Sequence, residues 1–128
     1  MDIELIKIKI DNFKKLEKNW NSYGAEPFQE NFLERVKEIV DNLPVSIIER
    51  GNEISIGDPF VVPGDGGVQL EWLDPITKKE LEIEFNDREI GFLKVYPGNF
   101  MVEGEMERTT PINIIARELY DLIVWLIK

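Results

Sequence analysis

The 128-residue chain contains no cysteine and no histidine. Without cysteine it has neither disulfides nor thiolate metal ligands. Without histidine it lacks the side chain best suited to proton transfer near neutral pH and the commonest transition-metal ligand. Serine–histidine and cysteine–histidine nucleophile pairs and most zinc sites are therefore excluded. Catalysis is disfavoured, although carboxylate, lysine or tyrosine chemistry stays open.

Long hydrophobic runs are also missing, and positive charge is scarce. No apolar segment approaches the ~20 residues that span a bilayer, and the acidic start Met1-Asp2-Ile3-Glu4 is unlike a basic secretory signal. We therefore expect a cytoplasmic protein without a membrane partner. The 25 acidic and 15 basic side chains give a formal net charge of -10, which repels nucleic-acid phosphates. Direct nucleic-acid binding is not expected, and a basic protein is the complementary partner.

Length and composition predict one α+β domain spanning residues 1–128. With 43% hydrophobic residues the chain can bury a core of ordinary size. The predicted order is two N-terminal helices, an antiparallel β-meander of about four to five strands, and a C-terminal helix.

The helical signals lie near the N-terminus. Apolar residues at three- and four-residue steps favour one continuous helix over residues 3–20. A rival interpretation exists, because residues 6–10 alternate as a strand would, with Asp11 then capping a shorter helix. Gly24, which follows the first helix, is expected at positive φ. A second helix is predicted at about Gln29–Asn42.

The strand signals follow. Residues 45–62 are hard to interpret: Ile54, Ile56 and residues 60–62 carry strand propensity, but glycine and proline interrupt the segment. The glycine-rich segment 64–67 precedes a strand rather than a helix, which indicates a hairpin or strand-entry turn and not a phosphate loop. Thr110 is predicted to cap the closing helix, with Pro111 in its first turn. Alternation of apolar and polar residues predicts strands at 68–72, 81–85, 90–96 and 100–105.

A row of carboxylates is the first candidate site. Glu80, Glu82 and Glu84 point the same way along one strand, and Glu71 is expected on the same face of its neighbour. Like charges across a ladder destabilise it, so a hard cation such as Mg²⁺, Mn²⁺ or Ca²⁺ would be one explanation. We favour a solvated sheet face, because alternate strand residues lie ~6–7 Å apart; no metal and no cofactor are expected. The basic residues expected to offset the row are Lys78, Lys79 and Lys94.

Aromatic residues supply the other candidates. Trp20 and Tyr23 could form a binding hot spot beside the loop after the first helix, although a core role is favoured. Trp72, at an inward strand position, is predicted to be core. The closing helix is apolar around most of its circumference. It is expected either to lie between the sheet and the first helices, or to use Tyr120 and Trp125 in a homodimer or partner interface.

Two motifs carry a family resemblance. They are the loop Trp20-Asn21-Ser22-Tyr23-Gly24-Ala25-Glu26-Pro27 and the segment Pro63-Gly64-Asp65-Gly66-Gly67-Val68-Gln69-Leu70-Glu71-Trp72, followed by the strand Leu81-Glu82-Ile83-Glu84-Phe85. They resemble a family of small uncharacterised bacterial and phage-type proteins with a W-[DN]-x-Y-G-A-x-P loop and a D-G-G-[IV]-x-L-E-W strand. The resemblance covers roughly residues 13–86 and implies no catalytic residue. The family's company with mobile-element and phage genes implies an antitoxin, immunity or defence role, by analogy.

These features favour a non-catalytic interaction module that binds a basic protein. Its acidic face would steer association, and the aromatic loop or the closing helix would add apolar contact. One alternative is a divalent-metal-dependent hydrolase using Glu71, Glu80, Glu82 and Asp65. Another is an acidic nucleic-acid mimic that inhibits a defence complex.

Overall fold

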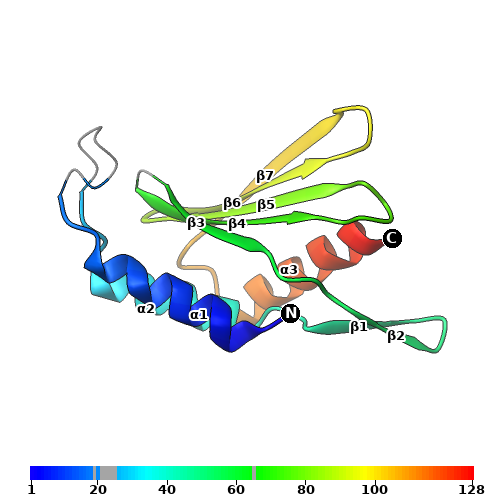
Figure 1. Cartoon of the computed structure of the whole chain (residues 1–128), viewed down its shortest axis with the longest axis horizontal. Coiled ribbons are helices and arrows are strands. Elements are labelled where there is room, and N and C mark those ends of the chain that lie inside the picture. Colours follow the sequence, from blue (N-terminus) through cyan, green and yellow to red (C-terminus); the bar gives the residue numbers. More distant parts are fainter. Residues whose placement is uncertain (19, 21–25, 65) are drawn as a thin grey trace.

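The computed structural model of the chain describes residues 1–18, 20, 26–64 and 66–128. They form an α+β fold with three α-helices, a short 3-10 helix and seven antiparallel strands in two sheets. All three helices lie on one side of the five-stranded sheet, as does a separate two-stranded hairpin (Figure 1). The elements in chain order are α1 (Ile3–Asn12), η1 (Phe13–Lys15), α2 (Glu30–Val40), β1 (Ser46–Glu49), β2 (Asn52–Ser55), β3 (Phe60–Gly64), β4 (Gly67–Leu73), β5 (Glu80–Asn86), β6 (Glu89–Val95), β7 (Met101–Glu107) and α3 (Ile112–Ile127).

The first helix is shorter than predicted. Asp2 caps α1 by accepting a 3.0 Å hydrogen bond from the Leu5 amide, which rules out the strand interpretation. The predicted continuous helix to residue 20 is wrong, because α1 passes into a 3-10 turn and the backbone is extended at Leu16. The apolar residues with helical spacing pack in two different places. The first part of α1 packs on the core, whereas the rings of Phe13 and Trp20 lie 6.0 and 5.9 Å from the ring of Phe28.

The second helix and the strand count also differ from expectation. Helix α2 occupies Glu30–Val40, within the predicted range. The total of seven strands exceeds the predicted four to five, because β1 and β2 form a hairpin in the segment whose pattern was hard to interpret. Arg50 and Gly51 both have positive φ in its turn. Strands of four residues are too short to give a clear alternating pattern.

The five-stranded sheet is a simple meander in the order β3-β4-β5-β6-β7. Gly64 pairs with Gly67 at the end of the β3–β4 hairpin, so these two glycines bound a hairpin connection, one of the two predicted alternatives. Gly66 has φ +78°, a conformation that L side chains rarely adopt. The register then sets Leu70 opposite Ile83 and Ile83 opposite Phe92, which places these apolar side chains on the inner face.

The core lies between the inner face and the helices. Trp72 is 5% exposed, as the core prediction requires, and its indole N–H donates to the Gly57 carbonyl at 3.1 Å. Residues that meet in the core come from both ends of the chain, with α1, α2 and α3 contributing to one apolar cluster. The sheet residues buried there are Val68, Leu70, Trp72, Leu81, Ile83, Phe85 and Ile90.

The closing helix begins one residue later than predicted. Pro111 occupies the cap position without a side-chain hydrogen bond, so Thr110 is not the cap. The Thr110 carbonyl instead accepts a 3.0 Å bond from the Arg35 guanidinium, which ties the start of α3 to α2. None of the helices formed by the described residues is long and apolar enough to cross a membrane.

The turn between β4 and β5 holds the other end of α3. The Thr77 hydroxyl donates to the Leu126 carbonyl at 2.8 Å, and the Lys79 ammonium donates to the Trp125 carbonyl at 2.9 Å. These bonds satisfy carbonyls that a helix C-terminus leaves without an intrahelical partner, and the lysine charge complements the helix dipole.

Candidate functional site

The outer face of the five-stranded sheet, formed by the outward-pointing residues of β3–β7, is covered by no helix of the described residues (Figure 1). We call it the open face. In the described strands its outward positions include no lysine or arginine, because each strand alternates between this face and the core. Its eight glutamates are Glu71, Glu80, Glu82, Glu84, Glu89, Glu103, Glu105 and Glu107.

The predicted carboxylate row is present at the centre of this face. Glu71 of β4 lies directly opposite Glu82 of β5, and Glu80 and Glu84 flank Glu82 along its own strand. Partial burial raises the pKa of the Glu82 carboxyl above its ordinary value of 4.5, and repulsion from the three neighbouring glutamates raises it further. The Gln69 amide donates to Glu71 at 2.7 Å and so satisfies one of its oxygens.

A second pair of carboxylates lies near the β7 side of the open face. Glu105 is opposite Gly91, so Glu89 is its diagonal neighbour across β6 and β7. A hydrogen bond from Glu89 and repulsion between the two carboxylates raise the pKa of Glu105.

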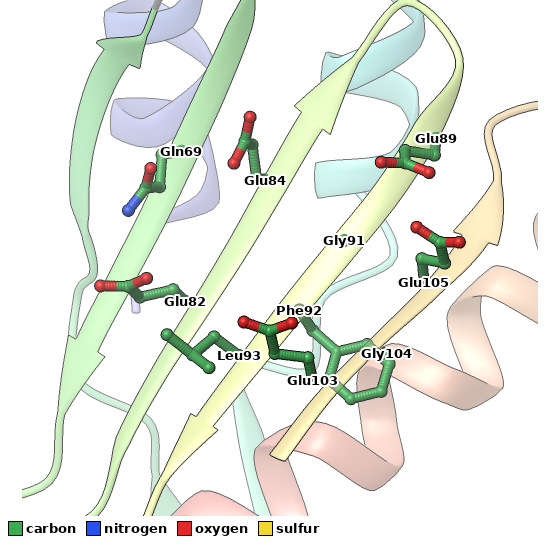
Figure 2. A pocket seen from close by; sticks show the side chains of 10 residues that line it. All are labelled: Gln69, Glu82, Glu84, Glu89, Gly91, Phe92, Leu93, Glu103, Gly104 and Glu105. Atoms are coloured by element: carbon green, nitrogen blue, oxygen red, sulfur yellow. The ribbon is translucent and has the colours of Figure 1, made fainter. Parts of the chain in front are cut away.

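A hollow joins the two carboxylate groups. Gly91 lies between Glu84 and Glu105 across three strands, and its missing side chain leaves a depression of about 290 Å³. Figure 2 shows the carboxylates around Gly91, with Glu82 and Glu84 on one side and Glu105 on the other. The depression is open, and five of the ten residues that line it are glutamates, which favours a cationic group from outside.

Two of the three lysines expected to offset this charge lie elsewhere. Lys94 is opposite Leu81, which is a core position, so it points to the helix side of the sheet. Its ammonium group and that of Lys79 lie 5.3 and 5.0 Å from the centre of the Trp125 ring. The prediction that these two lysines neutralise the row is therefore wrong, because neighbouring strand positions face opposite sides of a sheet. Ion pairs in the described residues join side chains of the N-terminal part of the chain, up to Asp41.

Apolar side chains border the acids on the open face. Phe60 and Val62 lie at the β3 side, and Phe60 is 71% exposed. Leu73 and Met101, which are 61% and 57% exposed, lie at the end where β5 begins and β6 ends. The acidic centre favours the approach of a positively charged group, and the exposed apolar side chains at its margin offer contact area beside the charges.

The other predicted site residues are dispersed. Trp20 is half-buried, and its indole N–H donates to the Glu26 carbonyl at 3.2 Å. Tyr23 and the φ of Gly24 lie outside the described residues. Tyr120 is 45% exposed on α3, whereas Trp125 is half-buried, with its ring edge-on to that of Tyr96 at 5.1 Å.

Four of the eight open-face glutamates were missed by sequence reasoning. Three of them alternate with Val102, Gly104 and Met106 along β7, a period of two that would have identified their common face. Glu89 begins β6 and had no such signal, because its inclusion depends on where the strand starts. The missed residues are Glu89, Glu103, Glu105 and Glu107.

The carboxylates do not converge in the way a metal centre needs. Within the described ranges no group of three or more aspartates or glutamates could hold a metal ion. Asp65, a ligand in the hydrolase alternative, lies outside the described residues. Comparison with family models, curated proteins and solved structures finds no match for the chain. The resemblance described from the sequence therefore stays an expectation.

Proposed function

We propose that this protein is a cytoplasmic, non-catalytic interaction module whose open face docks a basic protein partner. The observation that carries the proposal is the composition of that face in the described strands: eight glutamates, no basic side chain and an exposed apolar margin. A partner with lysines and arginines would remove the repulsion among the glutamates. Its apolar groups would cover residues such as Phe60 and Leu73.

The electrostatics support a protein partner in two ways. A face of one sign, within a chain of net charge -10, raises the association rate of a basic partner by steering. The raised pKa of Glu82 reflects the partial burial of its carboxyl and the repulsion from its neighbours, both of which cost stability in the free protein. Surfaces that sacrifice stability in this way are common at binding sites. An antitoxin or immunity protein opposing a basic toxin would be one setting for such binding.

Homodimerisation through α3 is less well supported. Its exposed large apolar residues are Ile114 and Tyr120, which lie about 120° apart around the helix at about 100° per residue. The run Leu122–Ile127 contains three buried and three half-buried residues, so its side chains already pack within the chain. Sedimentation of the wild type and of Tyr120→Glu tests the homodimer directly. A wild-type dimer that becomes a monomer in the variant would support the homodimer hypothesis.

The docking proposal is tested by affinity capture from the native host, followed by titration of the captured protein. The face variant carries Glu82→Gln, Glu84→Gln and Glu105→Gln. The matched control carries Glu17→Gln, Glu30→Gln and Glu118→Gln, which remove the same number of charges at exposed positions outside the sheet.

We expect a basic partner whose affinity falls about tenfold or more in the face variant and stays near the wild-type value in the control. Binding should also weaken as salt concentration rises. Equal loss in both variants would show that only net charge matters, and an acidic or neutral partner insensitive to the face variant would overturn the proposal. Competition of the partner by DNA would assign the protein to the nucleic-acid mimics.

A further inference from the structure

Strand β7 forms one edge of the five-stranded sheet, and no strand in the described part of the chain pairs with its outer side. Five of its seven residues are exposed. An edge strand presents unpaired backbone N–H and C=O groups and can act as a template for another strand. The groups that this edge presents therefore indicate what kind of strand could bind to it.

The hydrogen-bonding pattern of the β6–β7 ladder shows which backbone groups of β7 point to the free edge. The Tyr96 amide donates to the Phe100 carbonyl at 2.8 Å, and the Arg108 amide donates to the Arg88 carbonyl at 3.0 Å. Hydrogen-bonded pairs recur at every second residue of an antiparallel ladder. The inward-facing residues of β7 thus bond to β6, and the backbone groups of Glu103 and Glu105 point to the free edge.

The side chains of β7 divide the edge into an acidic and an apolar side. Glu103 and Glu105 stand on the open face, whereas Val102 and Met106 face the helix side. Gly104 lies between them on the helix side, where an added Cβ would overlap the Phe92 ring, so that ring extends across β7 toward the edge. A strand added here would find acids on one side and apolar groups on the other.

Two other arrangements fit less well. The opposite edge, β3, is shorter and contains Pro63, which has no N–H to donate. A second copy of this chain could pair β7 with β7 around Gly104, the middle of the strand. That pairing would set Glu103 of each copy against Glu105 of the other, and directly opposed like charges destabilise a ladder.

We propose that the β7 edge binds an extended segment of the basic partner as a sixth, antiparallel strand. Lysine or arginine residues of that segment lie opposite Glu103 and Glu105, and the apolar residues between them pack beside Val102 and the Phe92 ring. This strand addition rests on the proposed function, since it names how the basic partner binds. It combines backbone hydrogen bonds with alternating side-chain selection, as in other cases of strand addition.

The test uses three synthetic peptides with the full-length ¹⁵N-labelled protein. The parent is acetyl-Lys-Val-Lys-Val-Lys-Val-Lys-amide. In one derivative the backbone nitrogens of the inner lysines are methylated, and in the other those of the valines are methylated. Residues opposite Glu103 and Glu105 form the hydrogen-bonded pairs of this ladder, so methylated lysines block pairing, whereas methylated valines point away from β7.

We expect the parent and the valine-methylated peptide to bind with similar affinity, and the lysine-methylated peptide to bind about tenfold or more weakly. The parent should also slow hydrogen exchange at the Glu103 and Glu105 amides. Equal binding of all three peptides without slowed exchange would overturn strand addition. A captured partner that still depends on the open-face glutamates would then leave the docking proposal intact.

A pair of variants tests the same edge from the side of the protein. Glu105→Pro removes an outward-pointing N–H, and Glu105→Gln removes the same charge but keeps the N–H. Proline is tolerated at such edge positions, and thermal melting checks that both variants fold. Weaker parent-peptide binding by the proline variant than by the glutamine variant supports strand addition. Equal binding by two folded variants contradicts it.

Discussion

Glu71 and Glu82 are directly opposed on β4 and β5, at the centre of the open face. Cross-strand pairs of like charge destabilise a sheet, and this one lies among six further glutamates, with no basic side chain at the outward positions of the described strands. A sheet face selected for stability alone would alternate charges. The proposed basic partner would account for the opposed pair, because its cations would balance the charge that the free protein leaves uncompensated.

Replacing Glu82 by glutamine should stabilise the free protein. The change removes repulsion from Glu71 and the cost of partly burying a charge, so the free energy of unfolding should rise by roughly 0.2–1 kcal/mol at neutral pH. Urea denaturation measures the effect. In a double-mutant cycle the gain from Glu82→Gln should shrink when Glu71 is already glutamine; additive gains would show that the two carboxylates do not interact.

The raised pKa of Glu82 also predicts a pH dependence. The unfolded chain releases this proton near the ordinary value of 4.5, whereas the folded protein keeps it to higher pH. Protons bound by the folded state exceed those bound by the unfolded state in this window, so stability should fall as pH rises from about 4.5 through the raised pKa. Measured by denaturation between about pH 4.5 and 7, the free energy of unfolding should fall less steeply for Glu82→Gln than for Glu30→Gln. Identical slopes would contradict the assignment.

Two glycines on neighbouring strands should differ in their tolerance of alanine. A Cβ at Gly104 would overlap the Phe92 ring, whereas a Cβ at Gly91 would lie 4.0 Å from the Gly104 carbonyl oxygen, an ordinary van der Waals contact. Gly104→Ala should therefore cost about 1–3 kcal/mol through overpacking, and Gly91→Ala should stay within about 0.5 kcal/mol. Thermal or urea denaturation compares them, and equal costs would mean that the Phe92 ring moves aside freely.

The turn that holds the end of α3 should contribute measurably to stability. Thr77→Val removes the bond to the Leu126 carbonyl, and Lys79→Met removes the bond to the Trp125 carbonyl together with a cation over that ring. Each change should cost about 0.5–1.5 kcal/mol. Hydrogen exchange in the last turn of α3 should accelerate in both variants. Unchanged exchange there would show that the helix end is held by packing alone.

Truncating Trp72 should be the most damaging of these changes. Its side chain is 5% exposed and also donates to the Gly57 carbonyl. Trp72→Ala should cost about 3–5 kcal/mol, whereas Trp72→Phe keeps most of the apolar volume and should lose about 1 kcal/mol with the hydrogen bond. Wild-type stability of the alanine variant, measured by urea denaturation, would contradict the core assignment.

The sequence predicted those parts of the fold that depend on local patterns. Alternation along residues 68–72 and 81–85 identified two central strands, and with them the common face of Glu71 and Glu82, because side chains of a strand alternate with a fixed period of two. The spacing of apolar residues likewise located α2. It extended the first helix too far, because Phe13 and Trp20 keep the helical spacing while packing on Phe28.

Tertiary structure decided the pairing and the covering of these elements. The composition determined that the protein is acidic, but only the meander register gathered Glu89 and Glu105 beside the predicted row. Only the packing of the helices on the opposite side left that face open and placed the ammonium groups of Lys79 and Lys94 near the Trp125 ring. The physical reason is that a periodic pattern specifies the direction of a side chain relative to its own strand, whereas register and coverage depend on contacts between residues far apart in the chain.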